Sequence, residues 1–262
     1  MPNYVKARIT VRGRRELIDQ LVEQVKSTYK DEEGEEHEIL FDFNKVIPMP
    51  ESLDIADSSD GNMGMRYIMA LAKEDFVKTK EDLKLIDSMN EIKEKEPERF
   101  DEIIDTGKKY LHNIAEYGYP TWYRWRVNNW GTKWNACDIE SDGNGSFEFE
   151  TAWSFPYPVI EKLSSMYPEL EIDFMYADED CGYNTGRGTL KGGEEIDGEY
   201  PDGGSDRAYE IYSECWQNED FYKDPDGEWR WHDGVDADEE LEDPEDPIDG
   251  NADPIADVFG EK

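Results

Sequence analysis

One short segment of this sequence gathers the residues best suited to binding chemistry. Residues 117–136 hold four of the eight tryptophans, three cations and no carboxylate, in a chain of 262 residues with a formal net charge of −37. Aromatic rings interleaved with cations and amides are the groups that stack a nucleic-acid base and hold its phosphate. The candidate binding residues are Arg124, Arg126, Asn128, Asn129, Trp130, Lys133, Trp134 and Asn135. They predict a nucleotide-binding or nucleotide-processing site.

The same segment also has a structural interpretation. Tryptophans bury about 150 to 250 Å² each and dominate protein cores. Asn128, Asn129 and Gly131 are typical of a turn that leads into a strand. The favoured interpretation is therefore a turn and strand whose tryptophans fasten the helical part of the chain to a sheet. Lys133 distinguishes the two interpretations, because an ion pair with a carboxylate would weaken the case for a pocket.

A calcium-like motif follows this segment and is better explained as a turn. Asp138, Glu140, Asp142 and Gly143 match the start of an EF-hand loop, but Phe149 stands where that loop requires a bidentate Glu. Because the flanking residues alternate like strands, a hairpin turn is favoured over a metal site.

The other residues that could bind a metal or phosphate, or act in catalysis, lack the motif spacing that such sites require. The carboxylates of residues 178–180 are typical of a solvated acidic loop, and the glycines of residues 182–188 lack the Lys-Ser/Thr ending of a phosphate-binding loop. The histidines, His37, His112 and His232, lie apart from any nucleophile motif. The sequence therefore favours binding over catalysis and predicts no catalytic residue, metal or cofactor.

The acidic charge constrains the kind of partner. Residues 192–262 carry −22 of the total charge of −37, and the last 30 residues alone carry −12. Phosphate binding rests on neutralisation by Lys and Arg, so this balance argues against direct binding of duplex nucleic acid or an anionic membrane. The predicted partner is a protein with a basic surface, since spaced carboxylates can imitate a phosphate backbone. A tail that only promotes solubility is the alternative.

Aromatic residues in this acidic region favour docking over simple solvation. A solvating tail has little use for exposed tryptophan, so residues 209–231 are expected to pack on the domain or on a partner. The predicted partner-binding residues are Trp216, Trp229, Trp231, Asp236, Asp238, Glu239 and Glu240.

Cysteine usage and hydropathy predict a soluble cytoplasmic protein. Cys137, Cys181 and Cys215 form no CxxC pair, which argues against a disulfide framework and a zinc site and favours a reducing compartment. No apolar run approaches the ~20 residues of a membrane span.

Hydrophobic periodicity predicts an α+β protein with helices on one face of a sheet. The turn at residues 141–145 predicts a hairpin. Strands are predicted at residues 5–11, 39–43, 132–140, 146–153, 170–176 and 182–190, and helices at residues 17–29, 64–95, 97–117 and 156–167.

Three stretches of this sequence resemble the YubB-like family of phage and plasmid proteins. The stretches are residues 129–136 (NWGTKWNA), 149–154 (FETAWS) and 163–176. The resemblance covers residues 117–190, covers residues 3–11 more loosely, and does not extend to residues 192–262. It implies a ferredoxin-like C-terminal domain and a mobile-element setting, and it supplies no catalytic residues.

These observations predict an α+β fold with a ferredoxin-like mixed or antiparallel sheet, a helical insertion and an acidic C-terminal extension. The predicted parts are residues 1–50 as a β-α-β part of the sheet, 51–120 as the helical insertion, 121–191 as the ferredoxin-like part, and 192–262 as the acidic extension and tail. The predicted function is a non-enzymatic accessory protein of the host-cell cytoplasm that binds a basic host protein, as a counter-defence inhibitor mimicking nucleic-acid charge. A nucleotide-binding protein using residues 130–135 is the alternative, and a structural adaptor is a third possibility.

Overall fold

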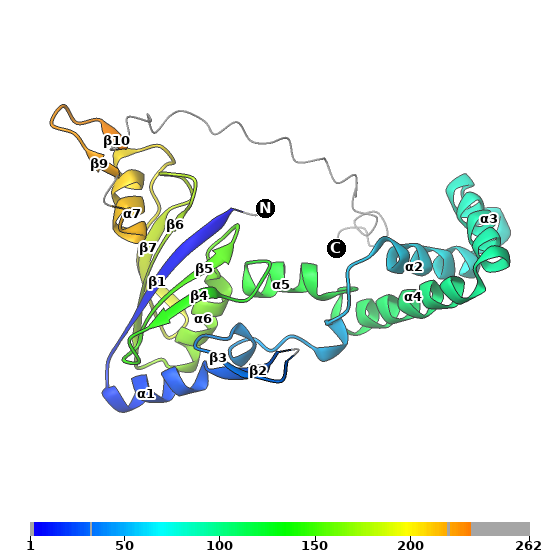
Figure 1. Cartoon of the computed structure of the whole chain (residues 1–262), viewed down its shortest axis with the longest axis horizontal. Coiled ribbons are helices and arrows are strands. Elements are labelled where there is room, and N and C mark those ends of the chain that lie inside the picture. Colours follow the sequence, from blue (N-terminus) through cyan, green and yellow to red (C-terminus); the bar gives the residue numbers. More distant parts are fainter. Residues whose placement is uncertain (1–2, 32, 219–220, 232–262) are drawn as a thin grey trace. The chain divides into compact units, whose positions relative to one another are not determined.

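The computed structural model describes residues 3–31, 33–218 and 221–231 (Figure 1). The chain forms two compact units, Met1–Gln217 and Asn218–Lys262. The first unit holds a six-stranded sheet and its helices, and the described part of the second is a short hairpin. The α+β prediction is confirmed.

The main sheet is antiparallel throughout, with strand order β4-β5-β1-β6-β7-β8. Its strands are β1 (Tyr4–Arg12), β4 (Cys137–Ser141), β5 (Ser146–Ala152), β6 (Glu171–Asp178), β7 (Gly186–Lys191) and β8 (Glu194–Glu199). The hairpin predicted at residues 141–145 joins β4 to β5, as expected. The first strand of the chain therefore lies inside the sheet, between strands that follow it by more than 130 residues.

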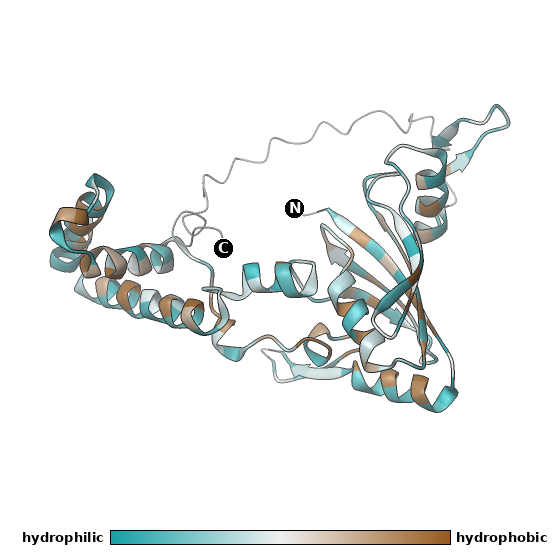
Figure 2. Cartoon of the chain, turned by 180° about the vertical axis from the view of Figure 1, so that it is seen from behind, coloured by the Kyte–Doolittle hydropathy of each residue, from teal (hydrophilic) through white to brown (hydrophobic). Residues whose placement is uncertain are grey.

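Strand β1 shows why one face of this sheet is buried. Val5, Ala7, Ile9 and Val11 are each at most 4% exposed, while the residues between them face the other side. Figure 2 shows the same alternation of hydrophobic and hydrophilic residues along the strands. The alternation fixes the register, because a slip by one residue would turn every apolar side chain to the opposite face.

Two amphipathic helices cover the apolar face. Helix α1 (Arg15–Gln24) contributes Leu21 and Val22 to the core, and helix α6 (Tyr157–Met166) contributes Ile160 and Leu163. Both were predicted, and both have apolar residues at helical spacing. The first was predicted to reach residue 29 but ends at Gln24, and Ser27–Lys30 form strand β2 instead.

The prediction that helices cover only one face of the sheet was wrong, because an additional helix, α7 (Asp206–Trp216), packs against the opposite face (Figure 1). Its Cys215 lies against the backbone of Lys6, and the Arg8 guanidinium donates to the carbonyl oxygen of Glu214 at 3.1 Å. Residues 192–217, which the sequence analysis grouped with the acidic extension, thus supply β8 and α7 to the sheet unit.

The prediction of a second sheet strand at residues 39–43 was wrong. Strand β3 (Glu36–Ile39) ends there and pairs only with β2 (Ser27–Lys30), in a separate hairpin. The Asp42 carboxylate accepts a hydrogen bond from the Asn44 backbone N–H, which begins the 3-10 helix η1 (Phe43–Lys45). Local capping by Asp competes with strand pairing in this way, even beside apolar residues that are buried.

The helical insertion contains α2 (Ser59–Ala72), α3 (Lys80–Lys95) and α4 (Pro97–Tyr117). The helix predicted at residues 64–95 is interrupted after α2, because Thr79 begins α3 with a capping box completed by Asp82. Helices α2 and α4 approach closely where Gly64 meets Gly107. The other 3-10 turns are η2 (Glu51–Leu53) and η3 (Asp75–Val77).

An unpredicted helix, α5 (Trp122–Trp130), follows the insertion and ends at Gly131 in the left-handed conformation. The prediction of a turn at Asn128 and Asn129 was wrong, because both lie in this helix, and the strand expected from residue 132 begins at Cys137. Trp130 is fully buried, its ring lies edge-to-face with Phe43, and its indole N–H donates to the Ile47 carbonyl oxygen at 2.9 Å. The Asn135 side chain accepts from the Phe43 N–H and donates to Asp42, both at 2.9 Å. These contacts join the NWGTKWNA stretch to residues 42–47.

The described hairpin of the second unit consists of β9 (Phe221–Lys223) and β10 (Trp229–Trp231). The Phe221 ring stacks on Trp229 with centroids 5.0 Å apart, and Trp231 lies 5.0 Å from the same ring. The Asp224 carboxylate shapes the turn by accepting from the backbone of Asp226 and Glu228. In neither unit does the described part of the chain contain a helix long and apolar enough to cross a membrane.

We expect Gly107→Ala to destabilise the protein although alanine favours helices by ~1 kcal/mol. A Cβ at this position would lie 2.4 Å from the Gly64 carbonyl carbon and 2.5 Å from the Met65 nitrogen, so the helices must separate. We predict a loss of about 1 to 3 kcal/mol in the free energy of unfolding, measured by urea denaturation. The neighbouring substitution Thr106→Ala should change it by less than about 0.5 kcal/mol. A Gly107→Ala protein more stable than the parent would contradict the close packing.

Candidate functional site

A lysine enclosed by aromatic rings is the most unusual arrangement of the predicted binding segment. The Lys133 ammonium lies 4.6 Å from the ring centroid of Trp134, 4.8 Å from Trp153 and 5.7 Å from Tyr123. These distances are within the range of cation–π attraction. We call Tyr123, Lys133, Trp134 and Trp153 the Lys133 cage.

Three different elements bring the cage together. Tyr123 belongs to α5, Lys133 and Trp134 to the loop before β4, and Trp153 directly follows β5. The loop is anchored by the buried Thr132, whose hydroxyl donates to the Ala152 carbonyl oxygen at 2.7 Å. Because Ala152 precedes Trp153, this bond holds the two sides of the cage side by side.

Trp153 is held in a conformation that tryptophan rarely adopts. Its φ of 68° lies in the left-handed region, and its side chain is 41% exposed. Its N–H donates to the Asn3 carbonyl oxygen at 2.8 Å, and its carbonyl oxygen accepts from the Asn184 side chain at 3.2 Å. A bulky residue with positive φ is strained, and such strain persists only where surrounding contacts impose it.

Asn184 belongs to the turn that precedes β7 and is itself left-handed, with φ of 43°. Its side-chain amide also donates to the buried carboxylate of Asp178 at 3.1 Å. Thr185 is 5% exposed, and its hydroxyl has no hydrogen-bond partner in the described part of the chain. Asn184 of the glycine-rich turn thus contacts the cage through its hydrogen bond to the Trp153 carbonyl oxygen.

Arg126 and Lys133, two of the three basic residues of this segment, differ in their counter-charges. The Arg126 guanidinium lies between the rings of Trp122 and Trp130, at 5.0 and 4.9 Å, and has Asp54 at 3.9 Å. Burial lowers the pKa of Arg126, and Asp54 opposes that shift. Lys133 has no carboxylate within ion-pair distance among the described residues.

The other predicted binding residues are divided between the core and the surface. Trp130 and Asn135 are committed to structural contacts, whereas Arg124 is exposed on α5. The Asn129 side chain donates to the Trp125 carbonyl oxygen, and Asn128 donates to the Tyr119 hydroxyl. Ligand binding therefore stays a prediction for Lys133, Trp134 and the exposed groups, and Trp130 has no exposed surface to offer.

The sequence analysis missed Tyr123, Trp153 and Asn184 as partners of Lys133. Trp153 lies 20 residues from Lys133 in the chain, and only the pairing of β4 with β5 brings them close. The sequence analysis identified the FETAWS stretch as a family motif. The spacing of its residues did not indicate that the Trp153 side chain would lie beside Lys133.

A second candidate surface is formed by the edges of the sheet. The six strands carry eleven carboxylates and five cations, and all five cations lie on β1 and β7. The edge strands β4 and β8 together carry six carboxylates and no cation. The edges are therefore the most acidic parts of the sheet.

The five cations are each paired with carboxylates across neighbouring strands. Lys6 and Arg8 bind Glu148, at 2.6 and 2.7 Å. The remaining pairs are Arg12 with Asp173 and Glu171, Lys191 with Glu171, and Arg187 with Glu199. No unpaired cation of the sheet is left to offset the edges.

Strand β8 is an exposed edge. Glu194, Glu195 and Asp197 are exposed, and Ile196 between them is 57% exposed. Glu199 at its end receives hydrogen bonds from Arg207 and Arg187, which hold the pKa of its carboxyl at about 2. These bonds fix one end of β8. The Glu195 carboxylate accepts hydrogen bonds from the hydroxyls of Tyr157 and Tyr200, and Glu194 and Asp197 are exposed.

The predicted partner-binding residues lie in three different places. Trp216 closes α7, where its indole N–H donates to the carbonyl oxygens of Ala177 and Asp178 and Lys6 lies 5.5 Å from its ring. Trp229 and Trp231 flank Phe221 in the second unit. The predicted acidic residues Asp236, Asp238, Glu239 and Glu240 lie outside the described residues.

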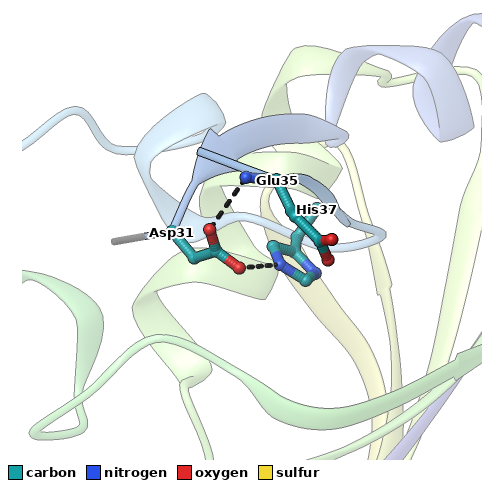
Figure 3. Close-up of side chains that lie close together, drawn as sticks. All are labelled: Asp31, Glu35 and His37. Carbon is teal, nitrogen blue, oxygen red and sulfur yellow. Dashed lines mark hydrogen bonds and ion pairs between the residues drawn. The ribbon is translucent and has the colours of Figure 1, made fainter. Parts of the chain in front are cut away.

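Other polar clusters are accounted for as turns. Figure 3 shows Asp31, Glu35 and His37, whose possible metal-binding atoms lie within 4.8 Å of one another. One oxygen of Asp31 accepts from the Glu35 backbone N–H at 2.8 Å, and the other lies 2.7 Å from the His37 ring nitrogen. The hydrogen bond with His37 lowers the pKa of Asp31. The EF-hand-like start is a hairpin turn, in which Asp142 accepts from the Ser146 backbone.

The three thiols are poor nucleophiles. Burial, followed by nearby carboxylates, raises the pKa of Cys137 to about 11 and that of Cys181 to about 12. Burial likewise raises the pKa of Cys215 to about 12, against the effect of Arg8 and Lys6. Reactive cysteines have the opposite shift, because the thiolate is the nucleophile.

The described fold defines an α+β protein built on a six-stranded antiparallel sheet. Residues 129–224 match the family model described as "Ferredoxin-like domain in Api92-like protein", so this part of the chain is similar to that domain. The match begins inside NNWGTKWNA and runs through α7 into β9.

Among solved structures, the chain is similar to a protein Api92 from Yersinia pseudotuberculosis. The similarity covers 78% of this chain and 100% of that one, with 12% identity and a TM-score of 0.33. This likeness is too low to establish a shared overall fold. No curated protein matched the sequence.

We expect the native thiols to react slowly with a disulfide reagent such as dithionitrobenzoate. A pKa of about 11 leaves roughly one thiolate in a thousand at pH 8. All three cysteines should react after unfolding in guanidinium chloride, and the native rate should rise steadily as the pH approaches 11. Free glutathione is the reference thiol. A native cysteine that reacts as fast as glutathione would show an activated nucleophile instead.

Proposed function

We propose that this protein acts by binding, without catalysis, and that it uses its acidic sheet edge to engage a partner protein with a basic surface. The observation that carries the proposal is the charge separation within the sheet. Cations on β1 and β7 are paired internally, while β4 and β8 carry six carboxylates and no cation. A basic partner would be attracted to such an edge and steered toward it.

Strand β8 supports docking by strand addition better than β4 does. It pairs with β7 alone among the described strands, and it places exposed Ile196 among three exposed carboxylates. Strand β4 is interrupted by Asp138, whose φ of 46° breaks the extended backbone. An extended segment with alternating cationic and apolar residues would match β8 in backbone pairing and in charge.

The setting that we propose is the cytoplasm of a host cell that carries a phage or plasmid. The resemblance to the YubB-like family supports this setting, and the acidity supports a partner that otherwise binds nucleic acid. In this form the protein is an accessory or counter-defence factor that occupies a nucleic-acid-binding surface by charge mimicry.

The proposal is tested with a defined probe, a fluorescent peptide of about ten alternating lysines and valines. We expect the full chain to bind it, and the affinity to fall as salt increases. A peptide of the same charge with proline at alternate positions cannot pair as a strand and should bind at least about tenfold more weakly.

Matched variants locate the contact. Glu194→Gln with Asp197→Asn on β8 should weaken peptide binding roughly tenfold, since two exposed ion pairs contribute about 0.7 kcal/mol each. The control is Asp101→Asn with Glu102→Gln, which removes the same charge from exposed positions of α4. Equal loss in both variants, or equal binding of the proline peptide, would argue against docking at β8.

A deletion of the acidic C-terminal region would not test this proposal, because part of that region belongs to the sheet. Removing residues 192–262 would delete β8 and α7, together with the ion pairs of Glu199, so loss of binding after that deletion would reflect unfolding. Point variants on β8 leave the elements in place and are therefore the informative test.

A further inference from the structure

We propose that the Lys133 cage binds a planar anion, specifically a nucleobase that carries a phosphate group. This inference is independent of the partner-binding proposal, because it rests on different residues. It narrows the predicted nucleotide site from residues 130–135 to Lys133 and the rings around it, and adds Trp153 and Tyr123, which lie outside that stretch.

The first observation concerns the contacts of the Lys133 ammonium. Three aromatic faces stabilise its charge, but rings leave the three N–H donors of an ammonium without strong acceptors. Among the described residues no carboxylate is close enough to pair with it, although the chain contains 65 carboxylates. Lys133 as a residue is only half-buried, so an incoming anion could reach its amine. Lys133 is thus prepared to receive an acceptor that the described chain does not supply.

The second observation is that Trp153 is exposed and has a strained backbone. Its side chain is 41% exposed, although an aromatic ring of this size gains most by burial. Its left-handed backbone is imposed from both sides, by Asn3 on its N–H and by Asn184 on its carbonyl. Strained backbone of this kind concentrates at ligand clamps.

The two features together select the ligand class. A phosphate bound to Lys133 would place an attached planar ring beside Trp153, whose exposed face can stack any base. Tyr123 meets Trp153 edge-to-face at 6.4 Å and keeps that ring from turning. A simple inorganic anion would leave the exposed ring unused, and an uncharged base would leave the ammonium unpaired. The site therefore fits a nucleoside phosphate, free or at the end of a single strand.

The test uses adenosine monophosphate, adenosine, inorganic phosphate and a single-stranded tetranucleotide, titrated into the full chain by calorimetry. The salt concentration should be near 0.15 M, so that the field of distant carboxylates is screened beyond about 8 Å. We expect adenosine monophosphate to bind at least tenfold more tightly than adenosine or phosphate alone. Tighter binding of the tetranucleotide through the same residues would assign the ligand to a strand end.

Three substitutions separate ligand contact from support of the fold. Lys133→Met keeps the aliphatic chain and removes the charge, and should weaken nucleotide binding at least tenfold. Lys133→Arg should retain most of the binding. Trp153→Gly removes the stacking ring at a position whose positive φ suits glycine, so binding should be lost while the protein stays folded. Lys162→Met, at an exposed position on α6, is the control and should bind as the parent does.

Two outcomes would overturn the proposal. One is the absence of binding by adenosine monophosphate and the tetranucleotide up to millimolar concentration in the folded full chain. The other is binding that Lys133→Met and Trp153→Gly leave unchanged, which would place the nucleotide elsewhere. The β8 variants should not alter nucleotide affinity, so failure of this inference is distinguishable from failure of partner docking.

Discussion

The structure depends on how one cationic strand neutralises an acidic sheet. Strand β1 lies between β5 and β6 and supplies Lys6, Arg8 and Arg12 to their carboxylates. Without these cations, the carboxylates of β5 and β6 on either side of β1 would lack their counter-charges. The same strand buries Val5, Ala7, Ile9 and Val11 on its other face, so its two faces perform the two tasks of core formation and charge compensation.

This arrangement explains why acidity gathers at the edges. All five cations of the sheet lie on the interior strands β1 and β7, and each pairs with carboxylates of one neighbouring strand, as Lys6 and Arg8 do with Glu148 on β5. The result is a neutralised middle and an acidic edge, and charges on an edge strand discourage random strand pairing.

The tryptophan-rich segment divides its residues between structure and surface. Trp130 and Asn135 tie the segment to Phe43 and Ile47, and this attachment fixes the loop on which Lys133 stands. These contacts of Trp130 and Asn135 thus set the position of Lys133 and Trp134. A binding group is more precise when rigid elements hold it in this way, so the structural and ligand-binding interpretations of NNWGTKWNA apply to different side chains of one motif.

The sequence by itself determined the elements whose periodicity is strong and locally capped. Strand β1, helices α1, α4 and α6, and the hairpin of β4 and β5 follow from alternation, helical spacing and turn residues. It also determined the overall acidity, which is a property of composition alone. Tertiary structure decided the rest, because packing overrides weak local preference, as in α5, which is aromatic and polar yet helical. Residues 39–43 are mostly apolar, but the Asp42 cap begins a 3-10 helix there and they do not join the main sheet. The Lys133 cage was likewise decided by tertiary contacts, since Trp153 reaches Lys133 only through strand pairing and an imposed left-handed backbone. The spacing of residues within either stretch does not predict the contact between Lys133 and Trp153.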